Sequence, residues 1–272
     1  ASHGDTKHVL LFPQDPHECF EHAAAALDLA DRLQTPVFVM TDLDIGMNQR
    51  LSEPFAWDDQ RRYDRGKIMT AEMLDAGRDF GRYKDVDGDG IPWRTLPGTH
   101  PTKGSFFTRG TTRDEYARYS ETGPDYMRNV QRLAAKFRTA ATLVPQPVPR
   151  AAAQKTRYGV IYFGSTSPAM DEALHSLAES GIHVDALRLR AFPFPASVLE
   201  FIEAHDEVFV VEQNRDAQMR SLLINELAVA PAKLFAVLHY DGTPITARFI
   251  AQAVQRHMEA RQNDIVRRAR ST

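Results

Sequence analysis

The spacing of apolar residues predicts an α/β fold for the start of the chain. Residues 9–12 form an apolar run typical of a buried strand, residues 16–33 carry apolar side chains three and four apart, as a helix does, and residues 36–41 form a second short strand. A strand, a helix and a strand in so few residues make a βαβ unit, which requires a parallel sheet. Because one such unit leaves strand edges unpaired, we expect this half to be the closing part of a larger, here incomplete, parallel-sheet domain.

The second half alternates strands and helices with greater regularity. We expect strands at 157–164, 183–190, 207–214 and 234–242, and helices at 168–180, 194–205, 217–227 and 246–261. This alternation predicts a complete three-layer α/β domain.

Between the two halves the pattern is less regular. Residues 64–77 and 124–141 have helical spacing, and the second of these begins with a proline, which suits the first turn of a helix. Three prolines in five residues then indicate an extended, semi-rigid connector. We therefore divide the chain into a first part at 1–142, a linker at 143–156, a second domain at 157–262 and a basic tail at 263–272.

The composition is that of an ordinary globular chain of 272 residues, with 43% hydrophobic and 25% charged residues. A formal net charge of -3 argues against a general binder of nucleic acid, and no apolar run approaches the ~18 residues of a membrane span. The one cysteine, Cys19, excludes a disulfide within the chain and an iron–sulfur cluster or zinc site built from its own thiolates alone. It lies in a helical pattern, which favours a small buried apolar role over a nucleophile. We expect a cytoplasmic protein.

The segment Pro97–Glu121 has neither helical nor strand periodicity, yet it holds closely spaced Gly, Thr, Arg, His and Asp residues. Its paired aromatic residues provide apolar anchors that a solvated linker lacks, so the segment predicts a structured binding loop. His100, Lys103, Arg109 and Arg113 offer positive charge to an anionic substrate or cofactor, and they could equally be solvated.

Loops beyond the carboxyl ends of parallel strands meet at one edge of a sheet, where ligands and partners bind. In the second domain these loops are GSTS, VEQN and YDG. For Glu212, at the end of an apolar strand, a capping cluster and an interface role are both open. Ser165 and Thr166 could cradle an anion on backbone N–H groups or simply end a strand and begin a helix. The candidate residues of a domain or subunit interface are Ser165, Thr166, Glu212, Gln213, Asn214 and Asp241.

The sequence DVDGDG places Asp85, Asp87 and Asp89 at alternate positions before a glycine, as in the first half of a calcium-binding loop. Position twelve of such a loop is Leu96 rather than glutamate, so a bound Ca²⁺ or Mg²⁺ and an exposed Asp/Gly-rich turn are both open. The Gly-Asp-Gly inside it resembles the opening of the motif that holds Mg²⁺ and thiamine diphosphate. No Asn pair follows, and Asn129 is too distant, so we expect no diphosphate binding by this chain.

Several segments together resemble the C-terminal part of the alpha subunit of the 2-oxoacid:ferredoxin oxidoreductases, in the 2-oxoglutarate branch. The matching segments are ASHGD, TDLDIGMN, DVDGDGIPWRTLPGTHPTKGSFFTRGTTRDEY, FGST, VVEQN and YDG. They cover nearly the whole chain, from Ala1 to about Arg261. The long loop motif is the specific part of the resemblance.

The resemblance implies a thiamine diphosphate enzyme with Mg²⁺ that decarboxylates 2-oxoglutarate oxidatively to succinyl-CoA, or runs the reverse carboxylation of a reductive TCA cycle. Electrons pass through a [4Fe-4S] cluster to ferredoxin. In that family a beta subunit carries the cluster and the diphosphate motif. The alpha subunit supplies a thiamine pyrimidine-type domain and a transketolase C-terminal-like domain, sometimes with a fused gamma domain. The first part of the chain would then be a remnant of the pyrimidine-type domain.

The chain departs from the family in lacking the segment resembling YPITPS and the acidic residue that activates the thiamine ring. We therefore expect no catalytic residue in this fragment, which the rest of the alpha subunit and the beta subunit would complete. On this resemblance, a functional loop at 84–123 faces substrate or CoA through Thr99, His100, Lys103, Arg109, Arg113 and Asp114. Many relatives have His where Arg113 stands. The alternatives are a pyruvate-type oxidoreductase subunit and a non-catalytic, Ca²⁺-stabilised interaction module.

Overall fold

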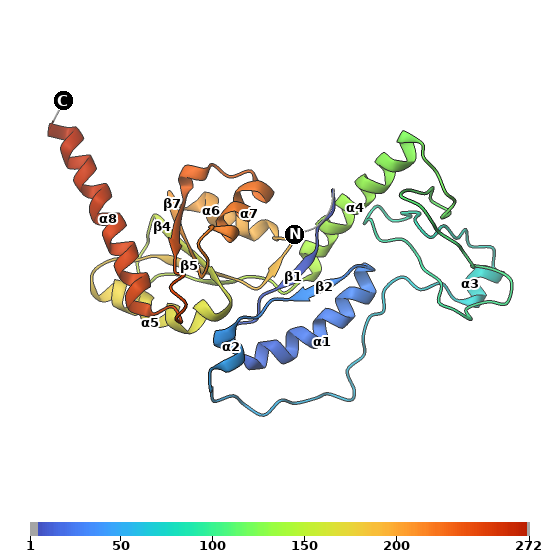
Figure 1. Ribbon diagram of the computed structural model, residues 1–272, viewed down its shortest axis with the longest axis horizontal. Coiled ribbons are helices and arrows are strands. Elements are labelled where there is room, and N and C mark those ends of the chain that lie inside the picture. The colour runs from blue at the N-terminus through green and yellow to red at the C-terminus, as the bar shows by residue number, and fades with distance from the viewer. Residues whose placement is uncertain (1–4, 271–272) are drawn as a thin grey trace. The chain divides into compact units, whose positions relative to one another are not determined.

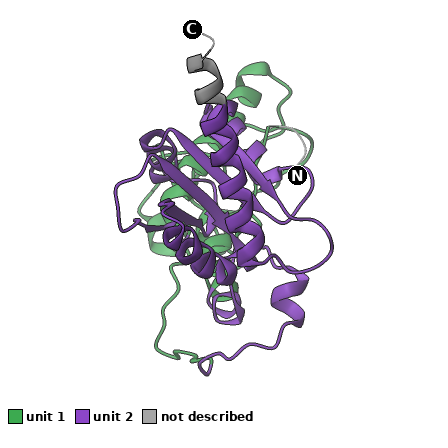
Figure 2. Cartoon of the chain, turned by 90° about the vertical axis from the view of Figure 1, so that its left-hand side faces the viewer, with its two compact units in different colours: residues 1–11, 22–38, 55–144 green, residues 12–21, 39–54, 145–272 purple. Residues whose placement is uncertain are grey.

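The computed structural model describes residues 5–270 and has a mixed α/β fold with parallel sheets, as predicted. The chain forms two compact units (Figure 2), which hold residues 1–11, 22–38 and 55–144, and residues 12–21, 39–54 and 145–272, respectively. Two short N-terminal stretches therefore belong with the second unit, whereas the sequence analysis placed all residues up to 142 in one part.

The chain begins with the predicted βαβ unit. β1 (Val9–Leu11), α1 (Pro16–Leu33) and β2 (Val37–Val39) lie where the apolar pattern placed them, and β2 lies beside β1. Leu11 of the strand and Leu33 of the helix have no exposed surface. The apolar positions of both elements thus face the core of the first unit, which is why the pattern located them correctly.

The helix predicted at 64–77 is wrong, because only one turn, α3 (Ala71–Asp75), is helical. The backbone N–H of Met69 donates to the carbonyl oxygen of Arg94 at 2.8 Å, and the N–H of Arg94 donates to the carbonyl oxygen of Lys67 at 2.9 Å. This pairing keeps the backbone before α3 extended. A distant segment thus overrides the local helical spacing.

The long helix α4 (Gly123–Leu143) is held by a turn that approaches it very closely. Gly90 has a φ of +78°, and a Cβ placed there would overlap the backbone of Lys136 and lie 2.5 Å from the carbonyl oxygen of Arg132. The Arg132 Nη1 also donates to the carbonyl oxygen of Gly90 at 3.0 Å. Only glycine fits both the backbone conformation and the space.

The second unit is built on a sheet with strand order β3-β5-β4-β7-β8, in which β4, β5, β7 and β8 are parallel. The strands are β3 (Val148–Arg150), β4 (Tyr158–Phe163), β5 (Asp185–Leu189), β7 (Glu207–Glu212) and β8 (Leu234–Leu238). The unit further contains α2 (Leu43–Met47), α5 (Ser167–Glu179), the short strand β6 (Ala191–Phe192), α6 (Ala196–Ala204), α7 (Gln218–Leu227) and α8 (Ala247–Arg270).

Helices cover both faces of this sheet. Val160 of β4 and Phe209 of β7 share one buried cluster with Met170 of α5 and Ile250 of α8. Alternate residues of a strand point to opposite faces, so Ile161 faces the other layer, and Figure 1 shows α6 and α7 on that side. The predicted three-layer arrangement is therefore present.

The segment predicted to be a linker contains the strand β3. Its residues pair antiparallel with β5, with Val148 opposite Arg188 and Arg150 opposite Ala186. An extended, proline-rich backbone is close to β geometry, and an edge strand tolerates a proline such as Pro149. The extended connector therefore contributes an edge strand to the second sheet.

The ends of the chain differ in part from expectation. α8 continues to Arg270, well beyond the predicted end at Arg261, because no glycine or proline interrupts the sequence. Residues 1–4 of the ASHGD segment and residues 271–272 of the basic tail lie outside the described residues. Among the helices of residues 5–270, none is both long enough and apolar enough to span a bilayer.

Candidate functional site

The carboxyl edge of the second sheet brings together residues from three loops. The Gln213 Nε2 donates to the Ser165 Oγ at 2.7 Å and lies 3.3 Å from the Thr166 Oγ1. Ser165 in turn donates to the carboxylate of Asp42. Three predicted interface residues therefore meet, and they meet a carboxylate that the sequence analysis did not single out. Asp42 lies just after the second predicted strand, which is the signal that could have identified it.

A pocket of about 760 Å³ opens beside this cluster. Its polar lining residues are Asp42, Asp44, Asn48, Gln213, His239, Tyr240 and Thr243. The predicted Asp241 stands beside it, accepts from the N–H and hydroxyl of Thr243, and lies 3.4 Å from the His239 Nε2. A pocket of this size with few charged groups can bind a small molecule or a side chain of another polypeptide.

Glu212 lies within the fold rather than in that pocket. Its carboxylate is fully buried and accepts from the backbone N–H groups of Met219 at 2.7 Å and Arg220 at 3.1 Å. The Asn214 Nδ2 donates to the same carboxylate at 2.7 Å. The structure therefore shows a cap on the first turn of α7, in which the helix N-terminus compensates the buried charge.

The predicted site residues of the loop at 84–123 do not form one cluster but lie in separate places. His100 and Lys103 contact Asp75 of α3: the His100 Nε2 lies 3.1 Å from its carboxylate, and the Lys103 Nζ lies 2.7 Å from it. Thr99 is bonded to the backbone of Leu96 nearby. His100 and Lys103 therefore already have a partner, which lies outside the loop, in α3.

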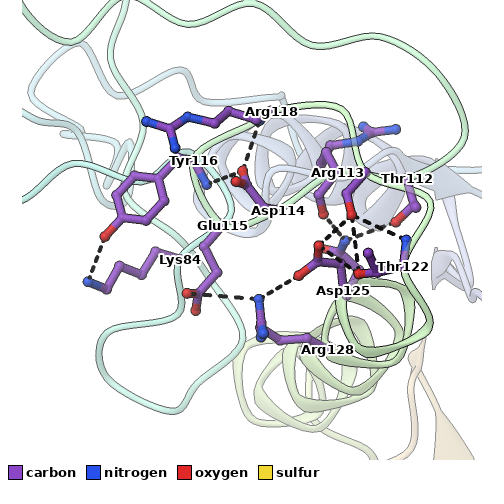
Figure 3. A network of polar contacts seen from close by, with 12 residues as sticks. Lys84, Thr112, Arg113, Asp114, Glu115, Tyr116, Arg118, Thr122, Asp125 and Arg128 are labelled. Carbon is purple, nitrogen blue, oxygen red and sulfur yellow. Dashed lines mark hydrogen bonds and ion pairs between the residues drawn. The ribbon is translucent and has the colours of Figure 1, made fainter.

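The next residues shape the end of the loop (Figure 3). Asp114 accepts from the backbone N–H groups of Tyr116 and Arg118, both at 2.9 Å, and so closes a tight turn. Arg109 is exposed and lies over the ring of Tyr119 at 5.2 Å. Neither residue faces a cavity shared with the His100 cluster.

Arg113 lies in a second pocket, of about 540 Å³, within the first unit. Its Nη1 donates to the hydroxyl of Tyr83 at 3.3 Å, and its Nη2 donates to the carbonyl oxygen of Gly110 at 2.9 Å. Arg82, Arg132 and Lys136 line the same pocket. The sequence analysis missed all three; the one local signal is the four-residue spacing that places the last two on one face of α4.

A lysine from an earlier segment of the chain contacts the acidic turn at residues 85–90. The Lys67 Nζ lies 2.7 Å from the Asp87 carboxylate and 2.8 Å from the Asp89 carboxylate. Asp85 accepts instead from the N–H groups of Gly88 and Gly90. Among the side chains that the structure describes, those of residues 5–263, no group of three or more His, Cys, Asp or Glu is arranged to hold a metal ion. Lys67 thus supplies a positive charge beside two of the three carboxylates.

Asn129 and Cys19 are the two residues that the sequence analysis weighed for thiamine diphosphate and for an iron–sulfur cluster. The amide of Asn129 is engaged, because it donates to the Thr112 Oγ1 at 3.2 Å and to the carbonyl oxygen of Arg113 at 2.7 Å. Cys19 is the one cysteine of the chain, and its half-buried thiol has a raised pKa because of burial and nearby carboxylates. One thiol of this kind cannot assemble a cluster.

Comparison with known proteins supports the resemblance seen in the sequence. No protein-family model matches the chain. It is 26% identical over 273 residues to the alpha subunit of 2-oxoacid:ferredoxin oxidoreductase 2 of Aeropyrum pernix, covering 98% of this chain and 40% of that relative. It is 27% identical over 221 residues to the 2-oxoglutarate synthase subunit KorA of Methanothermobacter thermautotrophicus, covering 79% of this chain and 54% of that relative.

A solved structure has the same fold. The 2-oxoglutarate:ferredoxin oxidoreductase of Magnetococcus marinus, with 2-oxoglutarate, coenzyme A and succinyl-CoA bound, superposes with a TM-score of 0.79 at 20% identity. The superposition covers 94% of this chain and 43% of that one. The chain resembles the C-terminal part of a 2-oxoacid:ferredoxin oxidoreductase alpha subunit. It spans less than two thirds of the length of these oxidoreductase subunits.

Proposed function

We propose that this chain is part of the alpha subunit of a 2-oxoacid:ferredoxin oxidoreductase, active only within a complex of several subunits. The observation that carries the proposal is that both sequence and fold match such subunits over nearly the whole chain, 98% by alignment and 94% by superposition. The reaction is the oxidative decarboxylation of a 2-oxoacid to an acyl-CoA with reduction of ferredoxin, or its reversal.

The proposed substrate is 2-oxoglutarate. 2-Oxoglutarate appears in the name of the Methanothermobacter relative and is a ligand of the Magnetococcus enzyme. A pyruvate-type enzyme is the alternative, because the Aeropyrum relative is named only for 2-oxoacids. The complex should turn over 2-oxoglutarate at least tenfold more efficiently, in kcat/KM, than pyruvate. An equal kcat/KM for the two substrates, or a higher value for pyruvate, would contradict the proposed substrate but not the proposed enzyme class.

The reactive groups of the proposed complex, thiamine diphosphate with Mg²⁺ and a [4Fe-4S] cluster, belong to its other chains, chiefly a beta subunit. The support is that Asn129 is already engaged and that Cys19 is the one cysteine. This chain would then contribute binding surfaces. The pocket at the sheet edge, with Asp42 and Gln213, is the proposed contact for a domain or subunit.

Arg113 is the loop residue best placed to contact an anionic substrate or CoA. It lines a pocket, whereas Arg109 is exposed over Tyr119. In the assembled complex, Arg113→Ala should raise the apparent KM for 2-oxoglutarate or CoA at least fivefold, and Arg109→Ala should change it less than twofold. Unchanged values for Arg113→Ala would remove this assignment.

A further inference from the structure

The pocket of the first unit has an unusual charge. Its four cationic lining residues are Arg82, Arg113, Arg132 and Lys136, and the one carboxylate among its described lining residues is Asp5, which is exposed. Like charges gathered around one cavity repel each other, and an anion in the cavity would relieve the repulsion.

Lys136 shows most clearly that the positive charge is poorly compensated. Its side chain is 5% exposed, and its ammonium group has a carbonyl oxygen, that of Gln34, at a long 3.4 Å. Burial, followed by the charges of Arg132 and Arg82, lowers the pKa of Lys136 to about 8. Within the described residues no carboxylate pairs with this ammonium group.

Three guanidinium groups surround one aromatic ring. Arg113, Arg82 and Arg132 lie 5.2, 5.3 and 5.7 Å from the centre of the Tyr83 ring. Burial raises the pKa of Tyr83, but the hydrogen bond from Arg113 and the nearby arginine charges outweigh burial and lower it. The three guanidinium groups thus favour negative charge close to the Tyr83 ring, at the pocket.

Arg132 has a buried N–H group without an acceptor. Its Nη1 binds the carbonyl oxygen of Gly90, while its Nε is buried and has no partner. A buried N–H group of an arginine costs free energy unless an acceptor meets it. An oxyanion in the pocket would supply that acceptor.

We propose that this pocket binds the phosphate group of a small-molecule ligand, held by Arg82, Arg113, Arg132 and Lys136. Arg82 and Arg132 would supply guanidinium N–H donors, Lys136 an ammonium group, and Arg113, whose terminal nitrogens already bind Tyr83 and Gly110, a further positive charge. This charge matches a doubly charged tetrahedral oxyanion better than a singly charged carboxylate. The cavity, at about 540 Å³, has room for more than the phosphate itself. The inference deepens the proposed function and rests on it, because Arg113 of this pocket is also the residue proposed to contact the substrate or CoA. A failure to bind phosphate would leave the oxidoreductase assignment, which the ferredoxin assay tests, unaffected.

Titration calorimetry of the purified protein, with whatever subunits accompany it, tests this site. The probes are inorganic phosphate and ADP at low ionic strength and in a phosphate-free buffer. The wild type should bind, and Arg82→Gln and Lys136→Met should each weaken binding at least tenfold. The matched control is Arg138→Met, which removes an exposed cation from the same helix and should change affinity less than twofold.

Two outcomes identify the source of the phosphate. Binding of ADP at least tenfold tighter than phosphate means that the cavity also holds a nucleotide, and equal affinities mean that free phosphate is sufficient. Lack of heat with both probes on the wild type would overturn the proposal. So would equal binding by the wild type, Arg82→Gln and Lys136→Met, provided that circular dichroism shows all three to be folded.

Discussion

Replacing Lys136 with methionine should stabilise the protein, although it removes a polar side chain from a long helix. A pKa lowered from 10.5 to about 8 means that the fold disfavours the charged form by roughly 3 kcal/mol. Methionine has a similar length and no charge. The substitution removes the long hydrogen bond from Lys136 to the carbonyl oxygen of Gln34, which stabilises the fold by about 1 kcal/mol at most. The net gain at pH 7, without phosphate, is therefore roughly 2 kcal/mol, or about 5 °C in Tm.

The gain should depend on pH. The pKa of Lys136 is lower in the folded than in the unfolded chain, so between pH 8 and 10.5 the unfolded chain binds more protons. As the pH rises through this window, deprotonation of Lys136 therefore stabilises the wild type. The variant has methionine at this position, which does not titrate, and so lacks this gain. The difference between the two proteins should shrink from pH 7 to pH 9.5. The lowered pKa of Tyr83 acts on both proteins alike and cancels in the comparison.

Urea denaturation of the wild type, Lys136→Met and the control Arg138→Met at both pH values is the assay. Arg138 is exposed, so its replacement should stay within about 0.5 kcal/mol of the wild type. A Lys136→Met variant less stable than the wild type at pH 7 would refute the reasoning. A difference that stays the same at pH 9.5 would refute it as well.

Three further predictions concern stability and can be measured by denaturant unfolding. Gly90→Ala should cost roughly 3 kcal/mol or more, because it adds a clash with α4 to a left-handed backbone, whereas Gly88→Ala, with the same φ but open space, should cost about 1–2 kcal/mol. Equal losses would contradict the docking role of Gly90. Arg188→Met should cost about 3–5 kcal/mol, because it leaves the carboxylate of Glu18, bound at 2.8 and 2.9 Å, buried with less compensation. Burial raises the pKa of Glu18, but Arg188 and Arg190 outweigh burial and lower it, so the stability lost in Glu18→Gln should be full at pH 7 and shrink as the pH falls below 4.5. A loss that does not change with pH would contradict this assignment.

Local periodicity predicted the regular elements well. The helix α1 was predicted with its observed bounds, and the parallel strands of the second unit were predicted in place, because each buries an apolar face that repeats at the period of its backbone. The helix expected at 64–77 failed for a non-local reason. Its first residues pair with Arg94, which lies far along the chain, and no helical spacing can reveal such a partner.

The site was harder to predict, because its residues meet only in the folded chain. For the acidic turn the sequence left a bound cation and an exposed turn open, and it could not reveal the contact with Lys67, which lies 20 residues before Asp87 and 22 before Asp89. The phosphate pocket likewise combines Arg82 with Lys136, 54 residues apart. By contrast, Ser165 and Gln213 were predicted to meet, because parallel strands place their following loops at one edge.

The most direct test of the proposed function is to purify the complex through a tag on this chain and measure its native mass, its iron and its thiamine diphosphate. We expect at least one further subunit, iron and thiamine diphosphate in the complex, and reduction of ferredoxin that requires both 2-oxoacid and CoA. Both groups should stay with the other subunits when this chain is dissociated. A chain that purifies alone as a monomer, or a complex that reduces no ferredoxin with any 2-oxoacid, would contradict the account.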